Sequence, residues 1–137
     1  MSYLVDTCAL SELVRPTPAP QVVEWFETVP PEALFISALT LGEIRRGAEK
    51  LPDGRRRNRI IGWLEIELPA WFEDRVLPVD AAVADEWGRL TAHLKQQMPS
   101  IDSLIAATAM KHRLTVITRN VADFAPAGIE IVNPWDL

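Results

Sequence analysis

The residues Pro99–Asn120, PSIDSLIAATAMKHRLTVITRN, are the most informative part of the sequence about its fold. Ser100 is a suitable N-cap, Asp102 falls in the first turn, and an almost entirely apolar helix is predicted through Met110, with His112 and Arg113 in its last turn. The next residues, Leu114–Thr118, form a short, largely β-branched run that is typical of a buried strand. A helix that leads directly into a buried strand indicates an α/β fold.

Asp102 is the acidic residue at the start of this helix. At about 100° per residue, Ala106 and Ala109 share its face, and such small residues let a helix approach other backbone closely. We therefore expect the Asp102 carboxylate to point along the seam between the helix and its sheet. The alternative is that Asp102 only complements the helix dipole.

The remaining elements follow from apolar runs, which predict strands, and amphipathic runs between them, which predict helices. The expected strands are Tyr3–Val5, Leu34–Ile36, Arg75–Val79, Leu114–Thr118 and Ile129–Val132. The other expected helices are Thr7–Leu13, Gln21–Thr28, Ala38–Lys50, a segment through Ile60 to Trp71, Ala81–Gln97 and a turn at Asn120–Phe124. About five short strands alternating with helices predict a three-layer α/β/α sandwich with a mainly parallel sheet.

Composition limits the class of protein. A chain of 137 residues with 48% hydrophobic residues is suited to one domain, residues 1–137, with a real core. The single cysteine, Cys8, cannot form an internal disulfide, and no run of about 18 apolar residues is present. We therefore expect a cytoplasmic protein without a membrane segment.

The net charge of -5 is the opposite of what a protein needs to hold nucleic acid by bulk positive charge. A polyanionic substrate would require a local arginine patch or cations bound at clustered acids. The strongly basic zone comprises Arg45, Arg46 and the segment Asp53–Arg59, DGRRRNR. This zone is either a solvated face or a surface that contacts phosphates.

Two further acids occupy positions typical of a functional site. Asp6 directly follows the first strand, and open parallel sheets bind ligands beyond the carboxyl ends of their strands. The alternative is that Asp6 only caps the next helix. Glu43 lies on a helix flank with Thr40 and Gly47 as neighbours, a position that a solvated glutamate also occupies.

Asp6, Glu43 and Asp102, with Asp123 or Asn120 as a fourth member, are predicted to converge at one edge of the sheet. Carboxylates that lie so close together repel one another unless cations lie between them. Oxygen ligands without histidine or cysteine select hard ions, which predicts Mg²⁺, with Mn²⁺ as a substitute. Such a site suits phosphoryl chemistry, because the ion activates water and stabilises the leaving oxygen.

The segments LVDTCALSEL, SALTLGEIRRG, PSIDSLIAATAMKHRLTVITRNVADF and IVNPW together resemble the PIN-domain ribonucleases. The resemblance is strongest to VapC-type toxins of toxin–antitoxin pairs, including the FitB-like subgroup. It implies a PIN-like fold and a Mg²⁺-dependent endoribonuclease that hydrolyses RNA. It also implies a homodimer, silenced by a cognate antitoxin protein and brought to operator DNA only through that antitoxin.

The resemblance also assigns roles. Asp6 and Asp102 would be the principal metal ligands, Glu43 a ligand or water-orienting base, and Asp123 the fourth acid. The residues expected to support these carboxylates are Thr7, Ser103, Thr118 and Asn120, and those expected to contact RNA are Arg45, Arg46, Arg55, Arg56 and Arg119. The chain departs from the family at Cys8, where relatives often carry asparagine, and at Asn120, where other PIN proteins place an acid.

Three other functions compete with this prediction. A phosphoaspartyl phosphatase needs a second acid two residues after the nucleophile, where this chain has Cys8. A binding module would keep the acids but act through its antitoxin as a co-repressor. A housekeeping PIN nuclease in RNA processing would have no antitoxin at all.

Overall fold

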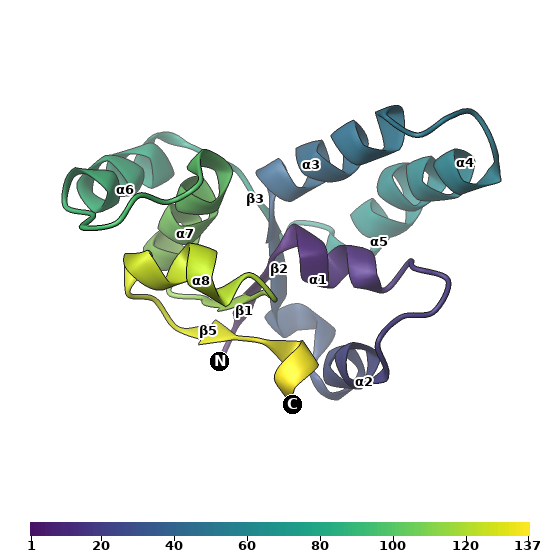
Figure 1. Ribbon diagram of the computed structural model, residues 1–137, viewed down its shortest axis with the longest axis horizontal. Coiled ribbons are helices and arrows are strands. Elements are labelled where there is room, and N and C mark those ends of the chain that lie inside the picture. The colour runs from purple at the N-terminus through teal and green to yellow at the C-terminus, as the bar shows by residue number, and fades with distance from the viewer.

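The computed structural model describes residues 1–137 and contains one sheet of five strands, all parallel, in the order β3-β2-β1-β4-β5. The strands are β1 (Tyr3–Val5), β2 (Leu34–Ser37), β3 (Val76–Leu77), β4 (Thr115–Ile117) and β5 (Ile131–Val132). Helices cover both faces of this sheet (Figure 1). The predicted α/β/α sandwich with a parallel sheet is therefore confirmed.

Eight α-helices connect the strands. They are α1 (Thr7–Glu12), α2 (Pro20–Thr28), α3 (Ala38–Glu49), α4 (Arg55–Gly62), α5 (Leu68–Phe72), α6 (Ala81–Ala92), α7 (Ser100–His112) and α8 (Val121–Phe124). Short helical segments complete the chain: η1 (Pro31–Ala33), the π-helical η2 (Trp63–Glu67), η3 (Ala125–Ala127) and η4 (Pro134–Asp136). None of these helices is both long and apolar enough to cross a membrane.

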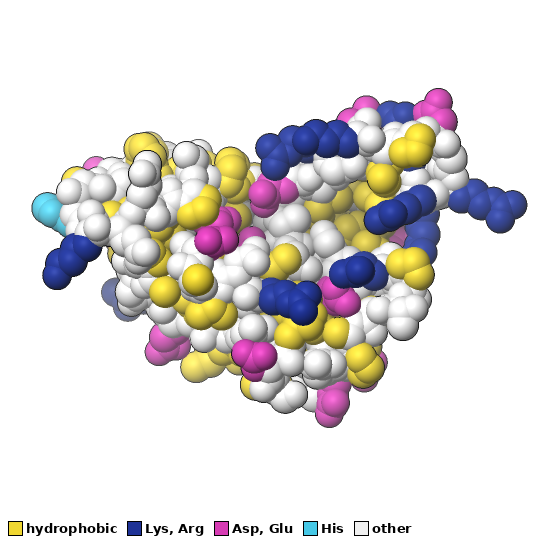
Figure 2. Space-filling view, viewed as in Figure 1, with side chains coloured by type: hydrophobic (Ala, Val, Ile, Leu, Met, Phe, Trp, Pro, Cys, Tyr) yellow, Lys and Arg dark blue, Asp and Glu magenta, His cyan; other side chains and the backbone are white.

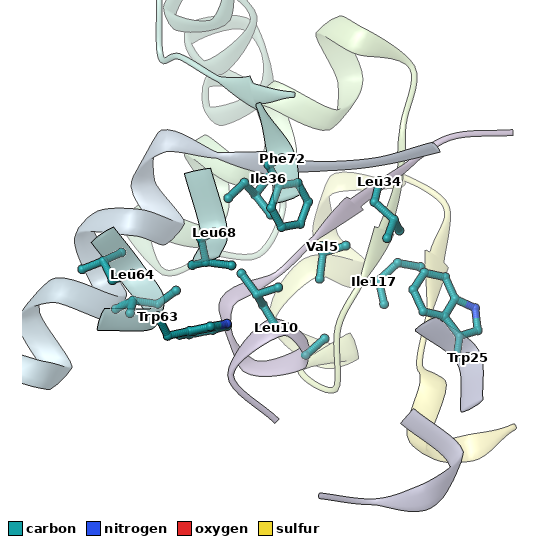
Figure 3. Close-up of a cluster of buried hydrophobic side chains, with 12 residues drawn as sticks. Val5, Leu10, Trp25, Leu34, Ile36, Trp63, Leu64, Leu68, Phe72 and Ile117 are labelled. Atoms are coloured by element: carbon teal, nitrogen blue, oxygen red, sulfur yellow. The ribbon is translucent and has the colours of Figure 1, made fainter. Parts of the chain in front are cut away.

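Alternating side chains of the strands fill the two halves of the core. Val5 and Ile117 point into one hydrophobic cluster together with residues of α1, α2, α3, η2 and α5 (Figure 3). Leu4 and Val116 point the other way, into a second cluster with residues of α7 and α8. The sheet is therefore buried on both faces, as expected for parallel strands.

The strand order places the carboxyl ends of β1 and β4 side by side. From β1 the chain passes to β2 and β3 on one side, and later returns to β4 and β5 on the other. The backbone N–H of Asp6 donates to the carbonyl of Ile117 at 2.9 Å, which locks the two strand ends together. This position, where the direction of strand addition reverses, is where α/β sheets bind their ligands.

Several predicted boundaries are wrong, for identifiable reasons. The third strand is only Val76–Leu77 rather than Arg75–Val79, because Pro78 has no N–H to continue the ladder. The sixth helix ends at Ala92 rather than Gln97, since the chain must reverse to pack α6 against α7. Ser100 is the first residue of α7 instead of its N-cap, which is Pro99.

The helix predicted through Ile60 to Trp71 is divided into α4, η2 and α5. Pro69 has no N–H for a regular helical hydrogen bond, and the wider π-helical turn directly precedes it. The division leaves Trp63 and Leu68 facing the core.

Candidate active site

Asp6 lies at the junction of β1 and α1, at the carboxyl edge of the sheet. Its Oδ1 accepts a hydrogen bond from the N–H of Thr7 at 2.9 Å, so Asp6 does cap α1. Its Oδ2 accepts from the hydroxyl of Thr118 at 2.8 Å, across the junction between β1 and β4. Burial raises the pKa of Asp6, while the hydrogen bonds from Thr118 and Thr7 oppose that shift. Asp6 is therefore the cap of α1 and also a buried carboxylate at this edge of the sheet.

Glu43 on α3 is linked to the same junction through Thr7. The Thr7 hydroxyl donates to Glu43 Oε1 at 2.6 Å and also lies 3.1 Å from the hydroxyl of Thr40. Thr40 is fully buried, so this contact is fixed by the core. Helical periodicity places Thr40 beside Glu43, but its contact with Thr7 is visible only in the fold.

Asp102 faces this pair from the first turn of α7. Its carboxylate is half-buried and has no hydrogen-bond or ion-pair partner among the side chains. Burial and then the charges on Asp6, Asp123 and Glu43 raise its pKa to about 6. The charges on three acids from separate segments therefore all act on the carboxyl of Asp102.

The acids do not form a compact cage. No three Asp, Glu, His or Cys side chains converge as a ready-made metal cluster. Asp123 is exposed on α8, and the side chain of Asn120 hydrogen-bonds nothing. The support from Asn120 comes from its backbone N–H, which donates to the Thr118 hydroxyl at 3.0 Å.

Ser103 does not support the acids, contrary to expectation. Its hydroxyl donates to the carbonyl of Ser100 at 2.6 Å and accepts from the indole N–H of Trp87 at 2.9 Å. One position along a helix turns the side chain by about 100°, so Ser103 faces α6 while Asp102 faces the site. Its role is to join α6 to α7.

Cys8 makes the contacts of a small polar residue at this edge. Its Sγ lies 3.6 Å from Asp6 Oδ2 and 3.4 Å from Thr118 Oγ1, and accepts from the N–H of Arg119 at 3.5 Å. Burial, and then the charge on Asp6, raise the pKa of the Cys8 thiol. The thiol is therefore protonated at neutral pH and adds no negative charge to the site.

The arginines near the site differ in their freedom. Arg45 lies between two acids, 2.5 Å from a Glu65 oxygen and 3.6 Å from a Glu49 oxygen. The candidates that make no ion pair are Arg46, Arg55, Arg56 and Arg119. Among the predicted RNA contacts, Arg45 is thus already engaged and the other four are available.

A hollow of about 500 Å³ lies between α1, α3 and α4, and Glu43 is the one of the four acids that lines it. Thr7, Cys8 and Glu43 line one end, and Ile44, Ala48, Leu51, Ile60 and Trp63 give it an apolar floor. Gly47 leaves this space open, because an added Cβ there would meet no atom within 4 Å. Lys and Arg side chains border the hollow on several sides, while Asp and Glu side chains gather at its left end (Figure 2).

The raised pKa of Asp102 predicts how stability depends on pH without metal. Below pH 3.8 the carboxyl is protonated in the folded and unfolded states, so it has no effect. As pH rises from 3.8 to about 6, the unfolded chain loses this proton first, and the free energy of unfolding falls.

The Asp102→Asn variant should therefore be more stable than the wild type at pH 7 in EDTA, with a smaller difference at pH 5. Urea unfolding measures this, and Asp74→Asn, which removes an exposed and unpaired carboxylate, should change little. A less stable Asp102→Asn variant at pH 7 would contradict the expectation.

Residues 3–126 match the family described as PIN domain, and the chain therefore belongs to the PIN-domain family. Its relatives in that family are proteins named as toxins and VapC ribonucleases. It is 36% identical over 135 residues to Toxin FitB of Neisseria gonorrhoeae, covering 96% of this chain and 97% of FitB. It is also 36% identical over 136 residues to VapC ribonuclease Y4jK of Sinorhizobium fredii, covering 97% of each.

Solved structures agree with this assignment over nearly the whole chain. The crystal structure of FitAcB from Neisseria gonorrhoeae matches with a TM-score of 0.93 at 36% identity, covering 98% of this chain and 99% of that one. A toxin–antitoxin complex from Klebsiella pneumoniae matches with a TM-score of 0.68 at 28% identity, covering 97% and 98%. The resemblance seen in the sequence motifs is thus confirmed at the level of the family.

Proposed function

We propose that this protein is a Mg²⁺-dependent endoribonuclease and acts as the toxin of a toxin–antitoxin pair. The observation that carries the proposal is the half-buried, unpaired carboxylate of Asp102, whose pKa is raised by burial and then by the charges on Asp6, Asp123 and Glu43. A charge so placed is unfavourable unless a cation offsets it. The ribonuclease name of a relative that matches the chain from end to end supports the same activity.

The donor set fits a hard divalent ion. Asp6 and Asp102 would be the principal ligands of Mg²⁺ or Mn²⁺, with Glu43 and Asp123 completing the site through direct contacts or through waters. The bound ion supplies a Lewis acid that activates water and offsets the charge of the phosphodiester. Thr118 orients Asp6 by donating to Oδ2, and Thr7 orients Glu43 by donating to Oε1. The free oxygen of Glu43 can then accept a proton from the attacking water.

The substrate and partners follow from the surfaces around the acids. Arg46, Arg55, Arg56 and Arg119 offer contacts to RNA phosphates, and Arg45 would do so only by leaving its carboxylates. The hollow with an apolar floor would accept a segment of the antitoxin, which would then cover Glu43. We further propose one domain over residues 1–137, a homodimer, a cytoplasmic location and contact with operator DNA only through the antitoxin.

Cleavage of cellular RNA tests the activity. Purified protein free of antitoxin should cut RNA at discrete sites with Mg²⁺ or Mn²⁺, and EDTA should abolish cutting. Metal-dependent cuts that disappear in the Asp102→Asn variant would establish the nuclease. A folded, antitoxin-free protein that cuts no RNA with either ion would contradict the proposal and favour the co-repressor role.

A further inference from the structure

Arg119 lies at the same edge of the sheet as Asp6. It directly follows Thr118, which donates to Asp6, and its own N–H donates to Cys8 Sγ at 3.5 Å. An exposed guanidinium at the same edge of the sheet as the carboxylates could pair with one of them. Instead it makes no ion pair and lies over the ring of Trp135, 5.1 Å from the ring centroid.

Trp135 is held firmly in its place at the same edge of the sheet. It lies on η4, just beyond β5, and its backbone N–H donates to Asn133 Oδ1 at 3.0 Å. Its carbonyl accepts from the side-chain amide of Gln21 on α2 at 3.1 Å. Val132 of β5 pairs with Ile117 of β4. The segments that follow these two strands, which carry Trp135 and Arg119, therefore leave the sheet side by side.

We propose that Arg119, held by stacking on Trp135, binds a phosphate of the RNA strand next to the phosphodiester that is cut. This inference rests on the proposed ribonuclease function and assigns a substrate contact within that site. One face of the guanidinium stacks on the indole, while its N–H groups stay free to donate to phosphate oxygens. Arg119 and Trp135 line the same hollow as Thr7 and Glu43, so a strand lying there would contact both Glu43 and the guanidinium.

The contact with Trp135 limits the positions that are open to the Arg119 guanidinium. In a chain with a net charge of -5, a guanidinium free to turn toward a carboxylate would form an ion pair there and be lost to the substrate. Trp135 keeps the guanidinium at a fixed place along the edge. Trp135 is thus a positioning residue, and Arg119 is the group that contacts the substrate.

The test measures binding of a fluorescently labelled single-stranded RNA by anisotropy in EDTA, where metal-dependent cleavage cannot interfere. Arg119→Gln should weaken binding about tenfold at moderate salt and lower the slope of log affinity against log salt by about 0.7. Lys111→Gln removes an exposed charge from the last turn of α7, far from the carboxyl edge, and should change neither value. Arg119→Lys should keep the salt slope but lose part of the affinity, because it lacks the planar fork.

Variants of Trp135 distinguish positioning from general support of the fold. Trp135→Phe keeps an aromatic face and should bind RNA nearly as the wild type does, whereas Trp135→Leu should approach Arg119→Gln. The double variant Arg119→Gln/Trp135→Leu should bind no more weakly than Arg119→Gln alone. A double variant that is clearly weaker would show that Trp135 acts independently of Arg119 and would overturn its positioning role.

Other outcomes separate this inference from the proposed function. A wild type that cuts RNA while Arg119→Gln keeps its affinity and salt slope overturns the inference alone. The same holds if Arg119→Gln weakens binding of the antitoxin but not of RNA. Arg119-dependent RNA binding without cleavage in Mg²⁺ or Mn²⁺ overturns the nuclease and leaves the phosphate contact standing. No RNA binding by the wild type in EDTA overturns the inference, while the cleavage assay with Mg²⁺ or Mn²⁺ decides the nuclease separately.

Discussion

Replacement of Asp6 by asparagine is expected to reduce metal-dependent RNA cleavage by more than about a hundredfold while the protein stays folded. Loss of an outer partner of a metal ligand typically costs about 10- to 100-fold, so loss of a ligand should cost more. Asparagine can still accept from the Thr7 N–H through Oδ1, and its amide can donate to the Thr118 hydroxyl. The variant also removes one of the charges that repel Asp102.

Initial rates on a defined RNA, with Mg²⁺ varied up to saturation, measure this effect. Because a missing ligand cannot be restored by mass action, the rate of Asp6→Asn should stay low at the highest Mg²⁺. Circular dichroism and the thermal midpoint confirm folding. A folded Asp6→Asn protein that cuts RNA at near wild-type rates would exclude Asp6 as a ligand, and an unfolded one would assign it a mainly structural role.

Replacement of Thr118 by valine is expected to weaken metal affinity about 10- to 100-fold without removing any ligand. Valine has nearly the same shape, but Asp6 Oδ2 loses the hydroxyl that donates to it at 2.8 Å. The same hydrogen bond lowers the pKa of Asp6, so its loss raises that pKa and favours the protonated acid. The variant should therefore need more Mg²⁺, and a higher pH, to reach half of its maximal rate.

Thr115→Val is the matched control for this experiment. Thr115 begins the same strand and is also buried, but its hydroxyl donates to Glu130 at 3.1 Å, at the opposite end of β4. It should leave metal affinity unchanged. Calorimetric titration with Mn²⁺ gives the affinity directly, and equal affinities for the wild type and Thr118→Val would refute the supporting role of Thr118.

The sequence predicts the acids of this site because their positions follow from local rules. Asp6 directly follows a strand, and Asp102 falls in the first turn of a helix, so the parallel sheet alone brings them to one edge. The contact between Thr118 and Asp6 spans 112 positions, but both residues follow neighbouring strands. Strand order, which the hydrophobic pattern does not contain, determines that these two strands are neighbours.

The features that could not be predicted depend on side-chain direction and on competition for partners. Ser103 is adjacent to Asp102 in the chain, yet its hydroxyl faces Trp87. The ion pair of Arg45 with Glu65 depends on how α3 packs against η2. The stacking of Arg119 on Trp135 joins two strand ends that only the sheet brings together.

The central place of β1 also determines when the site can exist during synthesis. β1 is synthesised first, but one of its edges can pair only with β4. Residues 115–117 of β4 are among the last to be synthesised. Until then Asp6 lacks Thr118, and Asp123 has not been added to the chain. A ribosome that stops before β4 is made therefore releases a fragment without a complete set of acids and without the strand that supports Asp6.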